Sequence, residues 1–302
     1  MLFALSLDEL SRVLVLGVSN GAIYSLIAIG LVLVYKASGV FNFAQGEFGT
    51  IAVYASSFAL TSFGVPYVVA LVIGLAASVG MGLATERVII RPLFDAPRVT
   101  LLVGTAGIAL LAIGVEFWRT AENPLRYFSP IIESQAGLAR ISPFGVPVSD
   151  QKLIAMAVLA VASFLLYLFF RSPLGLAVLA ASQEPVASEL VGVSVRRIST
   201  ITWGLAALLG GVAGLLYAGG GSYSPGLITA AVLIPGFTAA IVGGITSLPG
   251  AVAGGLIIGV MQALGGLSTF ESIKGASYVS VFVVLLVVLL IRPQGLFVSG
   301  KA

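Results

Sequence analysis

Residues 13–35 read VLVLGVSNGAIYSLIAIGLVLVY, and no charged side chain interrupts them between Arg12 and Lys36. A helix of about 20 residues, with a rise of roughly 1.5 Å per residue, is long enough to cross the hydrocarbon core of a bilayer. The stretch therefore predicts a membrane-spanning helix. Because Asp8 and Glu9 precede it and it lacks a small-residue cleavage pattern, we expect it to be retained rather than removed as a signal peptide.

The apolar character extends over the whole chain. Of the 302 residues, 59% are hydrophobic and only 9% are charged, with a mean hydropathy of +1.12, whereas soluble domains carry about 25% charged residues. This composition excludes a soluble globule and predicts an all-α, polytopic bundle in the lipid bilayer, formed by a single domain over residues 1–302. With a net charge of only +3, nucleic acid is not an expected partner.

The gaps between the sparse charges predict about nine spans, with eight or ten also open. The segment 228–245 is the least regular, because Pro235 and Gly243-Gly244 favour a broken or re-entrant helix there. The predicted spans lie near residues 13–35, 41–62, 66–86, 99–118, 153–170, 200–218, 228–245, 249–268 and 276–291.

Basic residues predict the orientation of the spans. Arg87, Arg91 and Arg98 cluster in one short connection, and further arginines lie in the segment 171–198. Short loops rich in arginine stay on the cytoplasmic side, so we expect both connections there. The segment 119–152 has a more dispersed mixture of charges with Pro and Gly, and we expect it to be an external loop.

Polar residues inside apolar runs are the candidates for a solute pathway. The run 40–49 contains Asn42, Gln45 and Glu47, and a carboxylate within the membrane costs about 2.5 to 3.5 kcal/mol unless it faces protein or water. Glu47 then has either Lys36 as a partner, if the chain folds back at residues 38–39, or hydroxyl, amide or water partners. A structural alternative is a helix start at which Asn42 is the cap and Glu47 lies near the positive end of the dipole.

Asn20 and Tyr24 are four residues apart and share one helical face of the first span. Such polar side chains either cross-link helices or contact a passing solute.

The segment 171–198 predicts a short helix from residue 182 to 191, with Pro185 in its first turn and Gly192 at its end. Its polar side has Glu184 and Glu189, and its apolar side includes Val186 and Leu190. Such an element either lies on the membrane surface or docks on a partner protein.

The sequence contains few of the residues and motifs that enzymes use for catalysis. The chain has no Cys and no His, which excludes disulfides, thiolate chemistry, a Ser/His/Asp triad and a His-bearing zinc site. It has no phosphate-binding G-x-x-x-x-G-K-[ST] motif, and its spans suggest no pair of intramembrane carboxylates. We therefore expect a transport protein that is not an enzyme and that binds neither a cofactor nor a metal.

The sequence resembles the permease subunits of branched-chain amino-acid ABC transporters of the LivH type. The resemblance is carried by GVSNGAIYSLIAIGLVLVYKASGVFNFAQGEFGTIAVY at 17–54, by VGV at 191–193, by IVGGITSLPG at 241–250 and by RPQGLF at 292–297. One departure is visible at 175–180, GLAVLA, where such permeases usually have a basic residue.

The resemblance implies a multi-pass subunit in the bacterial inner membrane. Its implied partners are a second, homologous permease, two cytosolic ATPases that hydrolyse ATP, and an extracytoplasmic solute-binding protein. By the same analogy, Asn42, Gln45 and Glu47 would lie near the pathway, and 182–192 would be the coupling helix. Relatives of this type also handle urea, amides or aromatic acids, so the solute stays open, and an ion- or proton-coupled secondary transporter that uses Glu47 is the alternative.

Overall fold

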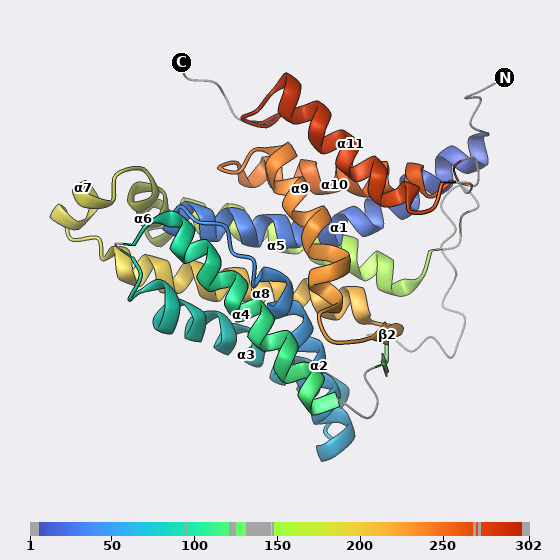
Figure 1. Ribbon diagram of the computed structural model, residues 1–302, viewed down its shortest axis with the longest axis horizontal. Coiled ribbons are helices and arrows are strands. Elements are labelled where there is room, and N and C mark those ends of the chain that lie inside the picture. Colours follow the sequence, from blue (N-terminus) through green and yellow to red (C-terminus); the bar gives the residue numbers. More distant parts are fainter. Residues whose placement is uncertain are drawn as a thin grey trace.

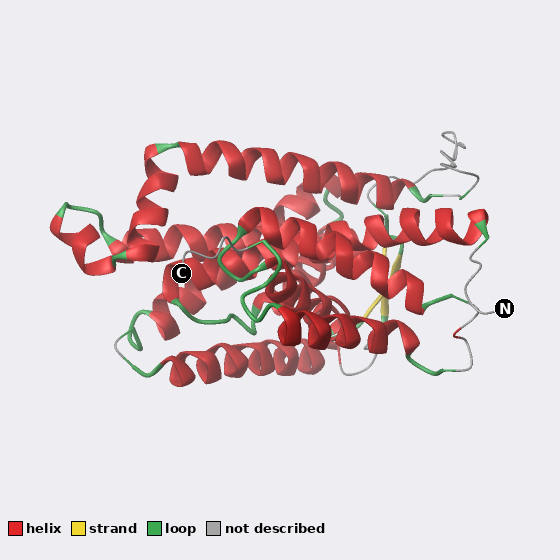
Figure 2. Cartoon of the chain, turned by 90° about the horizontal axis from the view of Figure 1, so that it is seen from above, coloured by secondary structure: helices red, strands yellow, loops and turns green. Residues whose placement is uncertain are grey.

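The structure is a computed structural model that describes residues 6–94, 96–120, 125–130, 146, 148–267, 270 and 273–297. Most of these residues are helical, as the composition predicts (Figures 1 and 2). In chain order the elements are α1 (Leu7–Ser38), α2 (Gln45–Phe63), α3 (Tyr67–Thr85), the π-helical turn η1 (Glu86–Ile90), α4 (Arg98–Thr120), β1 (Arg126–Phe128), α5 (Asp150–Arg171), α6 (Pro173–Gln183), α7 (Pro185–Leu190), α8 (Val195–Ala218), β2 (Gly221–Tyr223), the π-helical turn η3 (Thr229–Leu233), α9 (Ile234–Gly243), α10 (Leu248–Gly265) and α11 (Ala276–Ile291).

Helix α1 forms the centre of the bundle (Figure 1). Its residues from Gly21 to Val34 are all buried, and it packs against α8, α9, α10 and α5. A helix that is apolar on every side belongs in the interior of a large assembly of helices. The first span of the sequence is therefore the core around which the others are arranged.

Glycines bring the central helices into backbone contact. A Cβ atom added at Gly259 of α10 would lie 2.2 Å from the carbonyl oxygen of Gly17 in α1, and one at Gly214 of α8 would lie 2.4 Å from that of Gly49 in α2. Because small residues let helix backbones approach closely, these contacts hold α1, α2, α8 and α10 together.

The outer helices expose apolar side chains. Val72 of α3, Leu110 of α4, Leu165 of α5 and Leu290 of α11 are all exposed, whereas a soluble protein rarely exposes large continuous apolar surfaces. Six helices in the described part of the chain are long and apolar enough to cross a membrane. The chain is a multi-pass membrane protein.

Each predicted span contains a helix, and six of these helices are long and apolar enough to cross a membrane. The count of nine spans stays a prediction. The six long helices are α1, α3 with η1, α4, α5, α8 and α10, and the shorter apolar helices cover 173–183, 229–243 and 276–291. The segment 228–245 is irregular, as predicted: the π-helical turn η3 runs directly into α9, and Pro235 lies in the first turn of α9. Helix α2 begins at Gln45 rather than at residue 41, since residues 41–44 form the connection from α1.

The segment 119–152 is described only in part. Its strand β1 pairs antiparallel with β2, so that Arg126 lies opposite Tyr223. Residues 121–124, 131–145 and 147 of this predicted external loop lie outside the described residues.

The segment 171–198 differs from the prediction of one helix over 182–191. Two helices occur, because Pro173 opens α6 at a position that needs no N–H donor and the Ser172 hydroxyl accepts the Gly175 N–H at 3.2 Å. Helix α6 ends at Gln183. The next residue, Glu184, has a non-helical backbone (φ −138°, ψ 82°), as is expected of a residue that precedes proline, and α7 then begins at Pro185.

Candidate functional site

Helix α2 begins inside the protein. Gly39, with φ 66°, ends α1 and lets the chain turn back, and Ala44 and Gln45 at the start of α2 are fully buried. The Asn42 side chain accepts the Ala44 N–H at 3.0 Å, but the N-cap residue of α2 is Ala44. The interpretation of Asn42 as the helix cap is therefore wrong, and Asn42 stabilises the preceding turn instead.

Asn42 and Gln45 are hydrogen-bonded within the protein. The Asn42 amide donates to Gln45 Oε1 at 3.3 Å, and Gln45 Nε2 donates to the carbonyl oxygen of Ala206 in α8 at 2.8 Å. These bonds connect the start of α2 to α8. In this conformation both side chains perform a structural task.

Glu47, in the first turn of α2, is different. It has no exposed surface, and neither carboxyl oxygen makes a hydrogen bond of good geometry. Lys36 does not pair with it, because Lys36 lines a separate cavity beside α5 and α6. The prediction that Glu47 is shielded from lipid is consistent with this burial, while the proposed Lys36 partner is wrong.

The carboxyl group that Glu47 meets is that of Glu116 in α4. The two side chains interact directly, and Glu116 is only 3% exposed. Glu116 Oε2 accepts the N–H of Gly226 at 3.0 Å, whereas its Oε1 has no hydrogen bond. The expectation that the spans hold no pair of carboxylates is wrong.

Glu116 could have been found in the sequence as a lone carboxylate just beyond an uncharged run that ends at Val115. Its proximity to Glu47 could not, because the two residues are far apart in the chain. Only the packing of α2 against α4 and η3 brings them together.

Hydroxyl groups surround this carboxyl pair. Thr50 and Thr229 are polar neighbours of Glu47, and the hydroxyls of both are buried without a hydrogen bond of good geometry. Tyr54 interacts with Glu116, and its ring packs edge-on against that of Tyr223 with centroids 4.9 Å apart.

Tyr223 and Arg126 extend the cluster to the β1–β2 ribbon. Burial raises the pKa of Tyr223 above its ordinary value, so its phenol stays protonated and uncharged at neutral pH. Arg126 is the basic residue that interacts with both Tyr54 and Tyr223.

Two buried carboxyl groups in contact cannot both ionise without a compensating positive charge, since each is desolvated and repels the other. The compensating positive charge is either a proton bound to one carboxyl group or a cationic group of a ligand. The arrangement therefore suits the attraction of a positively charged group into the bundle.

The other two candidate residues, Asn20 and Tyr24, lie on a different side of α1. The Tyr24 hydroxyl donates to Gln262 Oε1 in α10, and Asn20 lines a cavity of about 860 Å³ with Gln262 and Tyr278. The five candidate pathway residues thus form two groups: one faces α10, and the other faces α4, α8 and η3.

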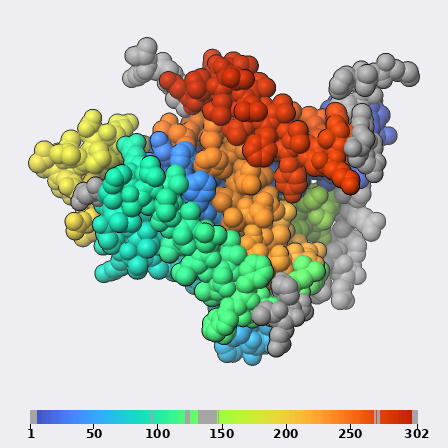
Figure 3. All heavy atoms as spheres, viewed as in Figure 1, coloured from blue at the N-terminus to red at the C-terminus, as the bar shows by residue number. Residues whose placement is uncertain are grey.

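The short helix α7 protrudes at one end of the molecule (Figures 1, 2 and 3). Val186 is 73% exposed and Leu190 is 84% exposed, while Ser188 faces inward. Glu184, Glu189 and Gly192 are also exposed. A small core formed by Val178, Ala181, Val195 and Ile198 supports the loop from α6 and α8.

A family model described as "Branched-chain amino acid transport system / permease component" matches residues 13–291. The chain belongs to this permease family. This membership favours the permease subunit of an ABC importer over an ion-coupled secondary transporter. The family consists of transport subunits rather than enzymes.

Curated relatives agree with the family model. The chain is 31% identical to the high-affinity branched-chain amino acid transport system permease protein BraD of Pseudomonas aeruginosa, over 94% of each chain. It is 30% identical to LivH of Escherichia coli over 93% of this chain and 92% of the relative. Identity to a probable LivH protein of Methanocaldococcus jannaschii is 28%, over 90% of this chain and 87% of the relative.

Proposed function

We propose that this chain forms half of the translocation pathway of an importer for branched-chain amino acids or a related small polar solute. In this proposal the chain crosses the bacterial inner membrane nine times and pairs with a second, homologous permease. Two cytosolic ATPases energise transport, and an extracytoplasmic protein delivers the solute. The names and the coverage of the relatives support the solute class and the partners.

The observation that carries the proposal is the contact between Glu47 and Glu116. An amino acid carries an ammonium group, and a buried carboxyl pair attracts such a group in a region where water cannot compete. The surrounding hydroxyls of Thr50 and Thr229 offer further polar partners. The pathway proposed here passes this pair, with Asn42 and Gln45 fixing the start of α2 beside it. Asn20 and Tyr24 are proposed to contact the solute at the α1–α10 side.

Uptake measurements with the assembled transporter in proteoliposomes test this pathway. Glu47→Gln and Glu116→Gln should each keep the subunits together and lower ATP-driven leucine uptake about tenfold or more, the effect of losing a hydrogen bond to a charged group. Asp8→Asn, at an exposed carboxylate in the first turn of α1, is the matched control and should not change uptake. Full uptake by Glu47→Leu in a normally assembled transporter would contradict the pathway.

We also propose that α7 is the element that docks on the ATPase. Val186 and Leu190 are four residues apart on one face, and both are largely exposed at the end predicted to be cytoplasmic. Glu184 and Glu189 would flank the contact as its polar rim, and Gly192, with φ 89°, ends the helix. The underlying small core makes the element stiff enough to transmit a movement.

A double variant, Val186→Ala with Leu190→Ala, tests the docking. If this face is fully buried by the ATPase, the change removes packing of about 2 to 5 kcal/mol, so ATPase association and uptake should both fail. Binding of solute by the external receptor should remain intact. Exposed Leu176→Ala in the neighbouring α6 is the control. Normal uptake with the ATPase still bound would assign α7 to the membrane surface instead.

A further inference from the structure

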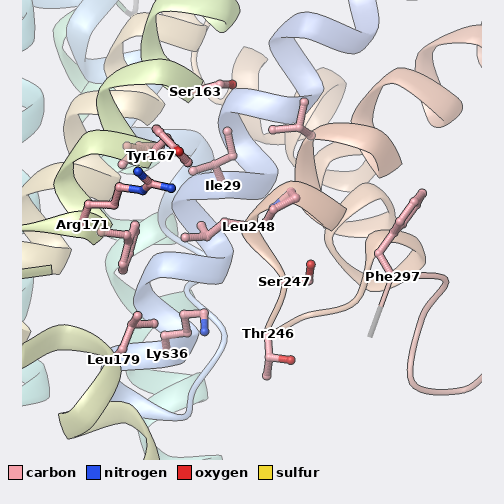
Figure 4. Close-up of a pocket in the computed structure, with 14 residues that line it drawn as sticks. Ile29, Lys36, Ser163, Tyr167, Arg171, Leu179, Thr246, Ser247, Leu248 and Phe297 are labelled. Carbon is pink, nitrogen blue, oxygen red and sulfur yellow. The ribbon is translucent and has the colours of Figure 1, made fainter. Parts of the chain in front are cut away.

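A cavity of about 810 Å³ lies between α1, α5, α6 and the start of α10 (Figure 4). It is separate from the carboxyl pair and from α7. Two basic side chains line it, Lys36 of α1 and Arg171 of α5. The lining contains no carboxylate among the described residues, so the cavity has an uncompensated positive charge.

Neither Lys36 nor Arg171 forms a salt bridge with a described acidic residue. The salt bridge present in the described part of the chain joins Arg91 to Glu86, away from this cavity. Arg171 instead lies over the ring of Tyr167, with its Cζ 4.5 Å from the ring centroid. The close-up shows Tyr167 and Arg171 together on α5, and Thr246 and Ser247 across the cavity from them (Figure 4). The cations and two hydroxyls thus gather around one cavity.

The positive charges lie at a particular depth. Lys36 is in the last turn of α1 and Arg171 is the last residue of α5, while Ser247 is the N-cap of α10. All three mark helix ends, which in a membrane protein lie near the headgroup region. The polar part of the cavity is therefore at the membrane interface.

The rest of the cavity lies deeper in the bilayer and is mostly apolar, with the Ser163 hydroxyl as a polar group in its lining (Figure 4). Ile29 precedes Lys36 by two helical turns, about 10 Å along α1. Leu166 lies five residues before Arg171, and Val252 lies in the second turn of α10. From the helix ends inward, the lining changes from cationic to mainly hydrocarbon, in the same direction as the membrane itself.

We propose that this cavity binds an anionic phospholipid, with its phosphate at Lys36 and Arg171 and its acyl chains along Ile29, Leu166 and Val252. Basic pockets between helices on the cytoplasmic side suit such headgroups. A small soluble anion would satisfy the charges but leave the apolar lining uncovered, whereas a phospholipid covers both. The inference is independent of the proposed solute and of the pathway.

Native mass spectrometry of the assembled transporter, with added phosphatidylglycerol or phosphatidylcholine, tests the proposal. We expect phosphatidylglycerol to bind in preference. Each basic side chain near a membrane surface contributes roughly a fivefold change in affinity for an anionic lipid, so Lys36→Gln with Arg171→Gln should weaken phosphatidylglycerol binding about 25-fold. The charge-preserving pair Lys36→Arg with Arg171→Lys should retain most of it.

Arg196→Gln, at an exposed arginine outside the cavity, is the control for a general loss of charge and should leave lipid binding unchanged. Equal binding of the two lipids, or undiminished phosphatidylglycerol binding by the Gln double variant, would overturn the proposal. Displacement of phosphatidylglycerol by inorganic phosphate at an equal concentration would also overturn it, and would identify a site for soluble anions.

Discussion

Two places in the described part of the chain bury carboxyl groups, and they are built in opposite ways. Glu86, the first residue of η1, is 1% exposed and pairs with Arg91 Nε at 3.1 Å. Arg91 also donates to the Thr200 hydroxyl at 2.7 Å, and that hydroxyl lies 3.3 Å from Glu86 Oε2. Glu47 and Glu116 meet each other with no basic residue in contact among those described and with three of their four oxygens unsatisfied.

The difference separates a structural carboxylate from one that can receive a ligand. A buried charge that is paired and hydrogen-bonded fixes its surroundings, and removal of its partner is costly. A carboxyl pair with unsatisfied oxygens has unused bonding capacity, and natural proteins tolerate such groups mainly at functional sites. Glu86 joins η1 to α8, whereas three of the four carboxyl oxygens of Glu47 and Glu116 make no hydrogen bond of good geometry.

The largest effect should follow from breaking the satisfied site. Arg91→Met leaves the buried Glu86 without its ion-pair partner, and we expect a loss of about 3 kcal/mol of stability, toward the lower end for buried pairs because Arg91 is partly exposed. Thermal unfolding of the purified transporter measures it. Adding Glu86→Gln to Arg91→Met should recover most of the lost stability. If Arg91→Met alone were as stable as the wild type, the ion pair would not be structural.

A smaller effect should distinguish the two sites by the same substitution. Glu86→Gln removes the ionic partner of Arg91 and should lower stability by about 1 to 2 kcal/mol. Glu47→Gln replaces a carboxyl that lacks hydrogen bonds and should leave the melting temperature unchanged or raise it. The comparison fails if Glu47→Gln is the more destabilising of the two.

The smallest effects concern single hydroxyls. Thr200→Val removes the hydroxyl between Arg91 and Glu86 and should cost about 1 kcal/mol. Tyr54→Phe removes a buried hydroxyl that has no hydrogen bond of good geometry, and should change stability by less than about 0.5 kcal/mol. Equal losses in the two variants would mean that the hydroxyl cluster near Glu116 is as well satisfied as the Glu86 site.

The segment 171–198 shows the limit of prediction from local sequence. The sequence predicted a short helix over 182–191 with Pro185 in its first turn and Gly192 at its end. In the structure α7 begins at Pro185 itself and ends at Leu190, and Gly192, with φ 89°, follows it. The separate helix α6 was not predicted from the sequence, although Pro173 suits the first position of a helix.

The sequence by itself determined that this protein is a multi-pass helical membrane protein, roughly where most of its helices lie, and which family it resembles. These properties follow from the length of apolar runs, from helix-breaking residues and from motifs, all of which are local. Only the tertiary structure decided which polar residues meet: Glu47 with Glu116 rather than with Lys36, Tyr24 with Gln262, and Lys36 with Arg171 in one cavity. The physical reason is that helices of nearly uniform apolar surface can pack in many ways, and the choice depends on close glycine contacts between residues far apart in the chain, such as Gly17 with Gly259.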